Sequence, residues 1–175
     1  MNLLLNGETT ERLMFRAIRP SDYDDWLEFF RHPASHAHWI AERHTPEQEC
    51  KNWYARQLQR YQNDEGGMNV LVEKSTGRLV GHCGLLRQTV DGIAEIEIGY
   101  SFLPEFWNMG YATEAAMRCR DYALEHRLSP TLISIISVTN LPSEKVAIKV
   151  GMKLDKTTDY KGNRVNIFRV KLFEV

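Results

Sequence analysis

The sequence is poor in cysteine, in long apolar runs and in excess charge of either sign. Its three cysteines are odd in number and lack the CxxC spacing of metal and redox sites, so we expect reduced thiols in a cytoplasmic protein. No apolar stretch approaches the roughly 20 residues of a membrane span, and the beginning, MNLLLNGETTERL, lacks the basic leader and apolar core of a signal peptide. The formal net charge of -1 argues against a non-specific nucleic-acid binder. We therefore expect neither a membrane nor a nucleic acid as partner.

What the chain does contain is an ordered series of short apolar segments. Its 175 residues, 43% hydrophobic, suffice for one domain with its own core, and neither a repeat nor a low-complexity linker divides them. Apolar periodicity and capping residues predict strands at 12–19, 67–74, 79–86, 93–103 and 131–138, two more strands around 161–163, and helices at 21–32, 45–61, 110–126 and 143–150. Helices early, hairpins in the middle and a late β-α-β step indicate an α/β (α+β) fold with a mixed sheet.

The segment PEFWNMGYATEAAMR, residues 104–118, places a lone glycine between an apolar strand and a long predicted helix. The free N–H groups at the start of this helix point back toward the end of the strand, and the aligned peptide dipoles make that end an anion site. Gly110 has no Cβ, so a phosphate can approach the backbone closely. Taken alone, however, Gly110 is explained better by a tight strand-to-helix connection, since single glycines are common in loops.

The helix that follows has one face of small residues. Ala115, Ala116 and Cys119 recur at helical spacing, which predicts close packing against the sheet. Away from this face, Glu114 and Arg118 are expected to form an exposed i, i+4 ion pair that contributes roughly 0.3 kcal/mol.

A second informative segment, TNLPSEKVAIKVGMK, begins at residue 139 and carries Asn140, Ser143 and Gly151. Together the two segments resemble the GCN5-related N-acetyltransferase (GNAT) superfamily, whose signature is a strand, a pyrophosphate-binding turn that opens a helix, another strand, and Asn-x-x-Ser on a short helix. TERLMFRAIRPSDYDDW, LVGHCGL and EIEIGYSFLPEFWNMGYATEAA resemble the branch of ribosomal-protein N-terminal alanine and serine acetyltransferases. The resemblance covers nearly the whole chain. It implies a single acetyl-CoA-dependent N-acetyltransferase domain over residues 1–175, with a mixed sheet of about seven strands and helices on both faces.

The resemblance also implies how the pyrophosphate of acetyl-CoA is held. In the family's turn, Arg/Gln-x-x-Gly-x-Gly/Ala, the three fixed places are occupied here by Trp107, Gly110 and Ala112. Trp107 departs from the superfamily pattern but is similar to the ribosomal branch, and simple packing explains it as well as cofactor contact does. The backbone N–H groups expected to hold the pyrophosphate belong to Asn108, Met109, Gly110, Tyr111, Ala112 and Thr113.

In the family, the strand before the turn splays from the next strand, and the pantetheine arm lies in the gap between them. The matching cofactor-binding residues are Ser101, Phe102 and Leu103, with Asn140 and Ser143 on the later segment. One backbone N–H of this strand would also polarise the thioester carbonyl, which lowers the barrier by about 3 kcal/mol.

Direct transfer of the acetyl group to an amine needs a base, because an alkylamine is mostly protonated at pH 7. Strand alternation places Glu95 and Glu97 on one face. Glu97 is the preferred catalytic candidate, with a water relay as the alternative. For Glu95, ordinary pairing with a basic residue across the sheet is favoured.

The leaving thiolate needs a hydrogen-bond donor. Many superfamily members place a tyrosine seven residues after the Asn, where this chain has Ala147. Ser143 is the remaining local hydroxyl, and its position fits either a catalytic donor or a cap of the short helix.

The acceptor is the least determined part of the site. His32, His36, His38 and His44 lie close together in the sequence but lack a convincing set of metal ligands, so no metal is expected. We expect transfer to a primary amine, in first place a peptide or protein N-terminal α-amine. A small amine such as an antibiotic, polyamine or amino acid is the alternative substrate, and a non-catalytic acyl-CoA sensor is the alternative function. A symmetric homodimer is common among proteins of this family, but the sequence of this chain does not determine its oligomeric state.

Overall fold

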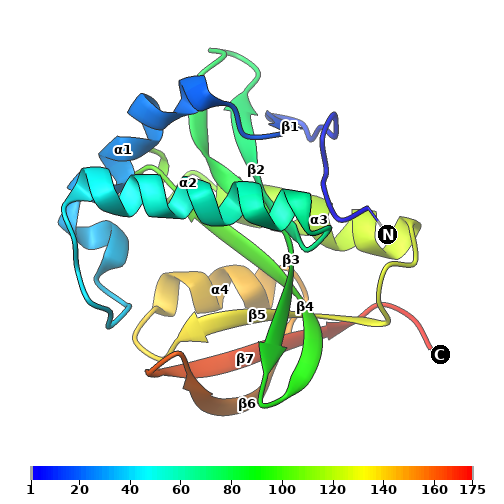
Figure 1. The fold of residues 1–175 in the computed structure, drawn as a ribbon. Helices are drawn as coiled ribbons and strands as arrows, with labels where there is room; N and C mark the ends of the chain where they lie inside the picture. Colours follow the sequence, from blue (N-terminus) through cyan, green and yellow to red (C-terminus); the bar gives the residue numbers. More distant parts are fainter. Residues whose placement is uncertain (1, 175) are drawn as a thin grey trace.

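The computed structural model describes residues 2–174, which form one seven-stranded sheet and four α-helices (Figure 1). The sheet order is β1-β2-β3-β4-β5-β7-β6, with β4 and β5 parallel and the other neighbours antiparallel. The strands are β1 (Leu13–Arg16), β2 (Gly66–Glu73), β3 (Leu79–Val90), β4 (Ile93–Phe102), β5 (Thr131–Ser137), β6 (Lys153–Tyr160) and β7 (Asn163–Lys171). The helices are α1 (Tyr23–Arg31), α2 (Pro46–Gln62), α3 (Tyr111–Glu125) and α4 (Leu141–Lys149). The expected α/β fold with a mixed sheet is confirmed.

Local sequence signals determine where helix α2 begins and where the β3–β4 hairpin turns. Thr45 caps α2, accepting a hydrogen bond from the backbone N–H of Gln48 at 3.2 Å. Asp91 and Gly92 have φ values of 50° and 77°, as a two-residue type I′ turn requires. This turn sets an unbroken antiparallel register along the whole β3–β4 hairpin.

Helices cover both faces of the sheet. On β3, the ring of His82 packs against Trp26 of α1 and Trp53 of α2, with ring centroids 4.2 and 4.6 Å away. The next residue, Cys83, places its Sγ 3.5 Å from Sγ of Cys119 on α3. Since successive side chains of a strand point to opposite faces, α1 and α2 lie on one face and α3 lies on the other.

α4 lies on the same face as α3. Tyr100 of β4 is opposite Cys83, and its hydroxyl donates to the backbone carbonyl of Ser143 at 2.9 Å. Arg120 of α3 donates to the carbonyl of Val150, just after α4, at 2.7 Å. The expected arrangement of helices on both faces is therefore confirmed.

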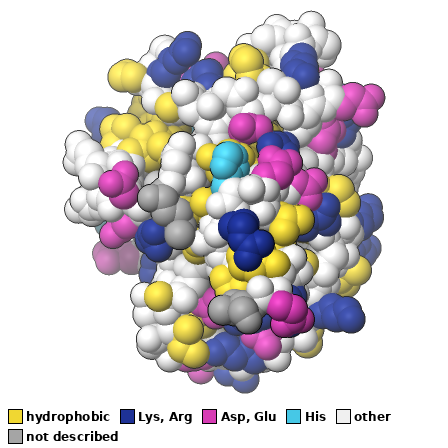
Figure 2. All heavy atoms as spheres, turned by 90° about the vertical axis from the view of Figure 1, so that its right-hand side faces the viewer, with side chains coloured by type: hydrophobic (Ala, Val, Ile, Leu, Met, Phe, Trp, Pro, Cys, Tyr) yellow, Lys and Arg dark blue, Asp and Glu magenta, His cyan; other side chains and the backbone are white. Residues whose placement is uncertain are grey.

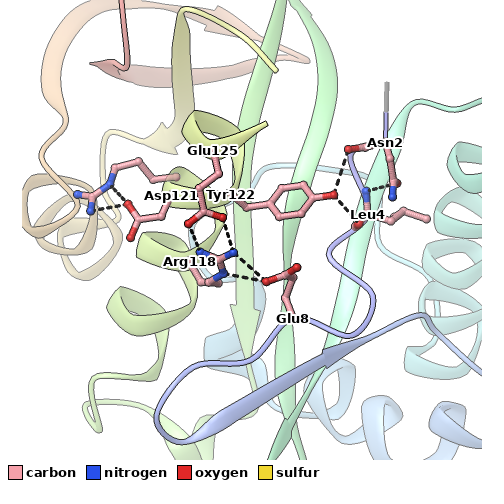
Figure 3. A network of polar contacts seen from close by, with 8 residues as sticks. Asn2, Leu4, Glu8, Arg118, Asp121, Tyr122 and Glu125 are labelled. Carbon is pink, nitrogen blue, oxygen red and sulfur yellow. Dashed lines mark hydrogen bonds and ion pairs between the residues drawn. The ribbon is translucent and has the colours of Figure 1, made fainter. Parts of the chain in front are cut away.

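The N-terminal segment runs along α3 and is held to it by ion pairs (Figure 3). Arg118 lies between Glu8 and Glu125, with N–O distances of 2.8 Å to each. Glu114 pairs instead with Arg12, 2.7 Å between Nε and Oε2. The predicted exposed pair of Glu114 with Arg118 is thus wrong, because the N-terminal segment covers this side of the helix and supplies each residue with its own partner.

On the face near the chain termini, basic and acidic side chains are interspersed, and neither sign of charge dominates (Figure 2). This agrees with the formal net charge of -1. Among the described residues, no helix combines the length and the apolar character that a membrane crossing demands.

Candidate active site

The site lies where β4 and β5 separate. These parallel neighbours are paired at Glu97 and Ile133, and both strands continue beyond that pair without further pairing to each other. Next to this pair, the carbonyl of Ile98 accepts a hydrogen bond from a side chain of β5 instead of its backbone, from Ser134 Oγ at 2.9 Å. The two strands therefore diverge toward their C-terminal ends, as the family resemblance implies.

A cavity of about 210 Å³ lies in this gap and is lined from both faces of the sheet. Glu97 and Leu86 line it on the face covered by α1 and α2. Tyr100, Asn140 and Ser143 line it on the face covered by α3 and α4. Two reactants can therefore meet in the cavity after approaching from opposite faces of the sheet.

The register of β4 determines which of its backbone N–H groups face the gap. The N–H of Leu103 donates to the carbonyl of Val80 at 3.0 Å, so Leu103 bonds toward β3. In an antiparallel pair these bonds alternate, so Ser101 also bonds toward β3, whereas Tyr100 and Phe102 direct their N–H groups toward β5. Of the three residues expected to hold the pantetheine arm, the register favours Phe102 for donation into the gap, and it adds Tyr100.

Glu97 and Glu95 lie on the same face of β4, as alternation predicts, but in different surroundings. Glu97 is partly buried; loss of hydration raises its pKa above the usual value, and hydrogen bonds from Gln88 (2.7 Å) and from the backbone N–H of Ile135 offset part of that increase. Glu95 pairs with Arg169 of β7 at 2.7 Å, which confirms the prediction that it has a basic partner. Glu97 is therefore a carboxylate that lines the cavity and whose pKa is raised by burial.

Asn140 and Ser143 take separate roles at the start of α4. Asn140 Oδ1 accepts a hydrogen bond from the N–H of Ser143 at 3.2 Å, so Asn140 is the N-cap and the helix begins at Leu141 rather than at residue 143. The alternative of Ser143 as the cap is therefore wrong. The Ser143 side chain lines the cavity and interacts with the side chain of Tyr100. Ala147, in the position of the family's tyrosine, is buried and has no hydroxyl to offer.

The turn before α3 presents a row of free backbone donors. Gly110 is the N-cap of α3 with φ 81°, and Asn108 has φ 61°, so both adopt left-handed conformations. The N–H groups of residues 108–113 have no acceptor among the described residues. Trp107 donates its indole N–H to the carbonyl of Phe102 at 2.8 Å, which ties the turn to β4. The conformation explains the glycine as a tight connection and, at the same time, leaves the donors free for an anion.

Arg12, which immediately precedes β1, brings a positive charge to this turn. Its Nη1 donates to the carbonyl of Met109 at 2.8 Å, and its guanidinium lies 4.2 Å from the ring centre of Tyr111. A Cβ on Gly110 would come within 3.3 Å of Arg12 Nη2. The turn itself has Trp107 where the superfamily has Arg or Gln, yet free N–H groups and a guanidinium are both present. These residues fit a pyrophosphate group.

Residues 37–45 form a strap that is tied to Thr139 and Asn163 and contributes one side chain to the cavity wall. The side chain of Asn163 bonds both backbone groups of Ile40, at 2.6 Å from its N–H and 3.0 Å to its carbonyl. His38 Nδ1 lies 2.9 Å from Oγ1 of Thr139. Trp39 lines the cavity. Within residues 2–174, no group of three or more His, Cys, Asp or Glu side chains is placed to hold a metal ion.

Three residues of the site were not predicted from the sequence. Gln88 could have been found, because the Asp91-Gly92 turn sets a register that pairs Gln88 with Glu95 and makes it the diagonal neighbour of Glu97. The same register identifies Tyr100. Arg12 could not, because 97 residues separate it from the turn that it contacts, and no local pattern connects segments so distant in sequence.

Comparisons with known proteins agree with this geometry. Residues 12–153 match the acetyltransferase (GNAT) domain family. The uncharacterized protein YkkB of Bacillus subtilis (strain 168) is 36% identical over 112 residues, 62% of this chain and 62% of YkkB, so less than two thirds of that relative's length is matched. An acetyltransferase from Agrobacterium tumefaciens str. C58 superposes with a TM-score of 0.79 and 23% identity, over 97% of this chain and 96% of that one. The ribosomal L7/L12 α-N-protein acetyltransferase RimL, solved in complex with coenzyme A, gives 0.74 and 14%, over 95% of this chain and 97% of RimL.

The fold, the divergence of β4 and β5, and the turn that opens α3 define an N-acetyltransferase domain. This chain belongs to the GNAT acetyltransferase family, as its sequence led us to expect. RimL is similar in fold, and at 14% identity the likeness extends to the fold alone.

Proposed function

We propose that this protein transfers the acetyl group of acetyl-CoA to a primary amine, foremost the N-terminal α-amine of a peptide or protein. One observation carries the proposal: the cavity between β4 and β5 is lined by Glu97 from one face of the sheet and by Ser143 from the other. A base and a hydroxyl donor on opposite sides of one small space are what direct transfer from a thioester to an amine requires.

The acetyl donor would lie on the α3 and α4 face, where acetyl-CoA supplies the acetyl group as a thioester. The free N–H groups of residues 108–113, with Arg12 beside them, would hold its pyrophosphate. The N–H groups of Tyr100 and Phe102 would bond the pantetheine arm and polarise the thioester carbonyl. Asn140, whose Oδ1 caps α4, still has its side-chain NH2 group available for the arm.

The amine would approach from the α1 and α2 face. As its nitrogen forms a bond to the carbonyl carbon, Glu97 accepts the amine proton, directly or through a water molecule. The carbon–sulfur bond then breaks, and the Ser143 hydroxyl donates a hydrogen bond to the departing thiolate. Because a thiol has a pKa of about 8.5, this thiolate leaves without needing a stronger acid.

The likeness to RimL supports a protein N-terminus as the acceptor, since that protein is an α-N-protein acetyltransferase. The strap of residues 37–45 would contact the residues that follow the acceptor amine, through Trp39 in the cavity wall.

The proposal is tested by incubating the protein with acetyl-CoA and a defined mixture of acceptors, followed by mass spectrometry. The mixture contains peptides with a free N-terminus and no lysine, N-terminally blocked peptides with lysine, and small amines including polyamines. We expect a mass gain of one acetyl group on peptides with free N-termini alone, and no gain when acetyl-CoA is replaced by coenzyme A.

The other outcomes each exclude part of the proposal. Acetylation of small amines alone would show that the acceptor is a small molecule. Acetylation of lysine side chains at the same rate as N-termini would exclude α-amine specificity. Binding of acetyl-CoA without any acetylated product would contradict the catalytic proposal and favour an acyl-CoA sensor.

A further inference from the structure

The side chain of Gln88 connects Glu97 to two donors on other elements. Its Nε2 donates to Oε2 of Glu97 at 2.7 Å. Its Oε1 accepts from Nη2 of Arg60 at 3.2 Å and from the hydroxyl of Tyr160 at 3.1 Å. The amide of Gln88 therefore connects Glu97 on β4 with residues of α2 and β6.

Arg60 leaves the amide of Gln88 only one favourable orientation, because a guanidinium can donate hydrogen bonds but cannot accept them. An amide has an acceptor end and a donor end, and both Arg60 and Tyr160 present N–H or O–H groups to the same end. Turning the amide over would place its NH2 group against the guanidinium of Arg60 and its oxygen against the carboxylate of Glu97. The Nε2 of Gln88 is thus held toward Glu97.

Three elements meet at Gln88. Gln88 is on β3, Arg60 is in the last turn of α2, and Tyr160 ends β6, immediately before the turn to β7. In the β3–β4 register Gln88 pairs with Glu95, so it is the diagonal neighbour of Glu97 on the same face. A contact made by the acceptor with α2 or with the β6–β7 hairpin would therefore reach the carboxylate through one amide.

We propose that Gln88 is the positioning residue of the base: held by Arg60 and Tyr160, it fixes the Glu97 carboxylate in its ionised form facing the cavity. This inference rests on the proposed function, in which Glu97 accepts the amine proton. Gln88 does not touch the reacting atoms itself.

The charges around Glu97 indicate what the loss of Gln88 would do. Arg60 on α2 and Lys161 in the β6–β7 turn favour the carboxylate, and Tyr100 on β4 is a neutral neighbour because burial raises its pKa. Burial raises the pKa of Glu97, and the Gln88 hydrogen bond is the first interaction that opposes it. Removing this donor leaves a buried charge with one hydrogen bond fewer, so the pKa of Glu97 should rise further.

The test is to titrate the carboxyl carbon of Glu97 by NMR in protein carrying 13C-labelled glutamate, with Glu97→Gln used to assign its signal. In Gln88→Met, which keeps the length of the side chain but cannot donate, we expect the midpoint to rise by about one pH unit. Tyr160→Phe removes one of the two donors to the amide oxygen of Gln88 and should raise the midpoint of Glu97 by less. Gln59→Met, the same substitution at an exposed position of α2, serves as the control and should leave the midpoint unchanged.

The kinetic counterpart is the pH profile of kcat/KM, measured with the acceptor that the acetylation assay identifies. In Gln88→Met, the acidic limb should move to higher pH by as much as the NMR midpoint does. Gln88→Asn retains a donor, so its limb should lie closer to that of the wild type. An unchanged Glu97 midpoint in folded Gln88→Met would overturn the inference. A shifted midpoint without any movement of the kinetic limb would instead show that Glu97 is not the base, and so would contradict the proposed mechanism.

Discussion

At the scale of single residues, Asn140 and Ser143 both lie at the start of α4 but are assigned different roles, one as the cap and the other as a hydroxyl donor. Two substitutions distinguish these roles. Ser143→Ala should lower kcat tenfold or more, since a hydrogen bond to a charged group contributes about 1.5–3 kcal/mol. Its free energy of unfolding should fall by no more than about 1 kcal/mol, because the Tyr100 hydroxyl that the Ser143 side chain contacts keeps the carbonyl of residue 143 as a partner. Turnover assays and urea denaturation measure the two quantities. Equal turnover in the variant and the wild type would remove Ser143 from the mechanism.

Asn140→Ala is the complementary change. It removes the side chain that accepts the N–H of Ser143, so the protein should lose about 1 kcal/mol of stability. Urea denaturation at the same pH measures the difference. A variant as stable as the wild type would contradict the assignment of Asn140 as the cap.

The residues of the site differ in how far the sequence reveals them. Glu97 and Ser143 were predicted because a strand pattern and an Asn-x-x-Ser motif mark them, and the structure brings both to one cavity. The choice between Tyr100 and Ser101 as backbone donors depends on which pairs of the hairpin are hydrogen-bonded, and the residue types do not specify this. Gln88 acts through a contact across two strands, which only the register of the hairpin discloses.

At the scale of elements, the turn that opens α3 combines a left-handed backbone with the anion site that we propose. Gly110→Ala should destabilise the protein by about 1 kcal/mol, because φ is 81°, and should also weaken binding of acetyl-CoA, because a Cβ would come within 3.3 Å of Arg12 Nη2. Isothermal titration calorimetry and thermal unfolding measure the two effects. Gly77→Ala is the matched control, since Gly77 has φ 71° in the β2–β3 turn with open space around its Cβ position. It should lose similar stability and keep full affinity, and a parallel loss of affinity in both variants would contradict the role of Gly110.

The elements themselves were predicted well where periodicity and turn signals coincide. The Asp91-Gly92 turn and the capping residue Thr45 identified a hairpin and a helix that the structure confirms. The start of α4 was misplaced by two residues, because Asn140 rather than Ser143 is its cap. The docking of the N-terminal segment on α3 was missed for a different reason: ion pairs between segments more than 100 residues apart leave no local pattern.

At the scale of the whole molecule, His82 links stability to pH. It is fully buried, neither ring nitrogen has a partner in the described chain, and burial lowers its pKa to about 3. Between its usual 6.5 and that value, the unfolded chain binds a proton that the folded protein does not. The free energy of unfolding should therefore fall as pH decreases through this range, by up to about 1.4 kcal/mol per pH unit.

His82→Phe should remove this part of the acid sensitivity, because phenylalanine keeps an aromatic ring between Trp26 and Trp53 and cannot be protonated. Urea denaturation at pH 7 and pH 4.5 gives the pH dependence for each protein. His44→Phe, at an exposed position, is the control and should retain the wild-type dependence. If His82→Phe loses as much stability on acidification as the wild type, His82 is not the cause.

The most direct test of the account compares the two carboxylates that lie on one face of β4. The measurement is kcat/KM for acetyl transfer by the wild type, Glu97→Gln and Glu95→Gln, across a range of pH. Glu97→Gln should lose about 10²–10⁴ in rate and its dependence on pH in the acidic limb, as expected for removal of a general base. Glu95→Gln should stay close to the wild type, since Glu95 pairs with Arg169, which keeps Asp155 as a second partner at 2.9 Å. Full activity in Glu97→Gln, or an equal loss in both variants, would contradict the account.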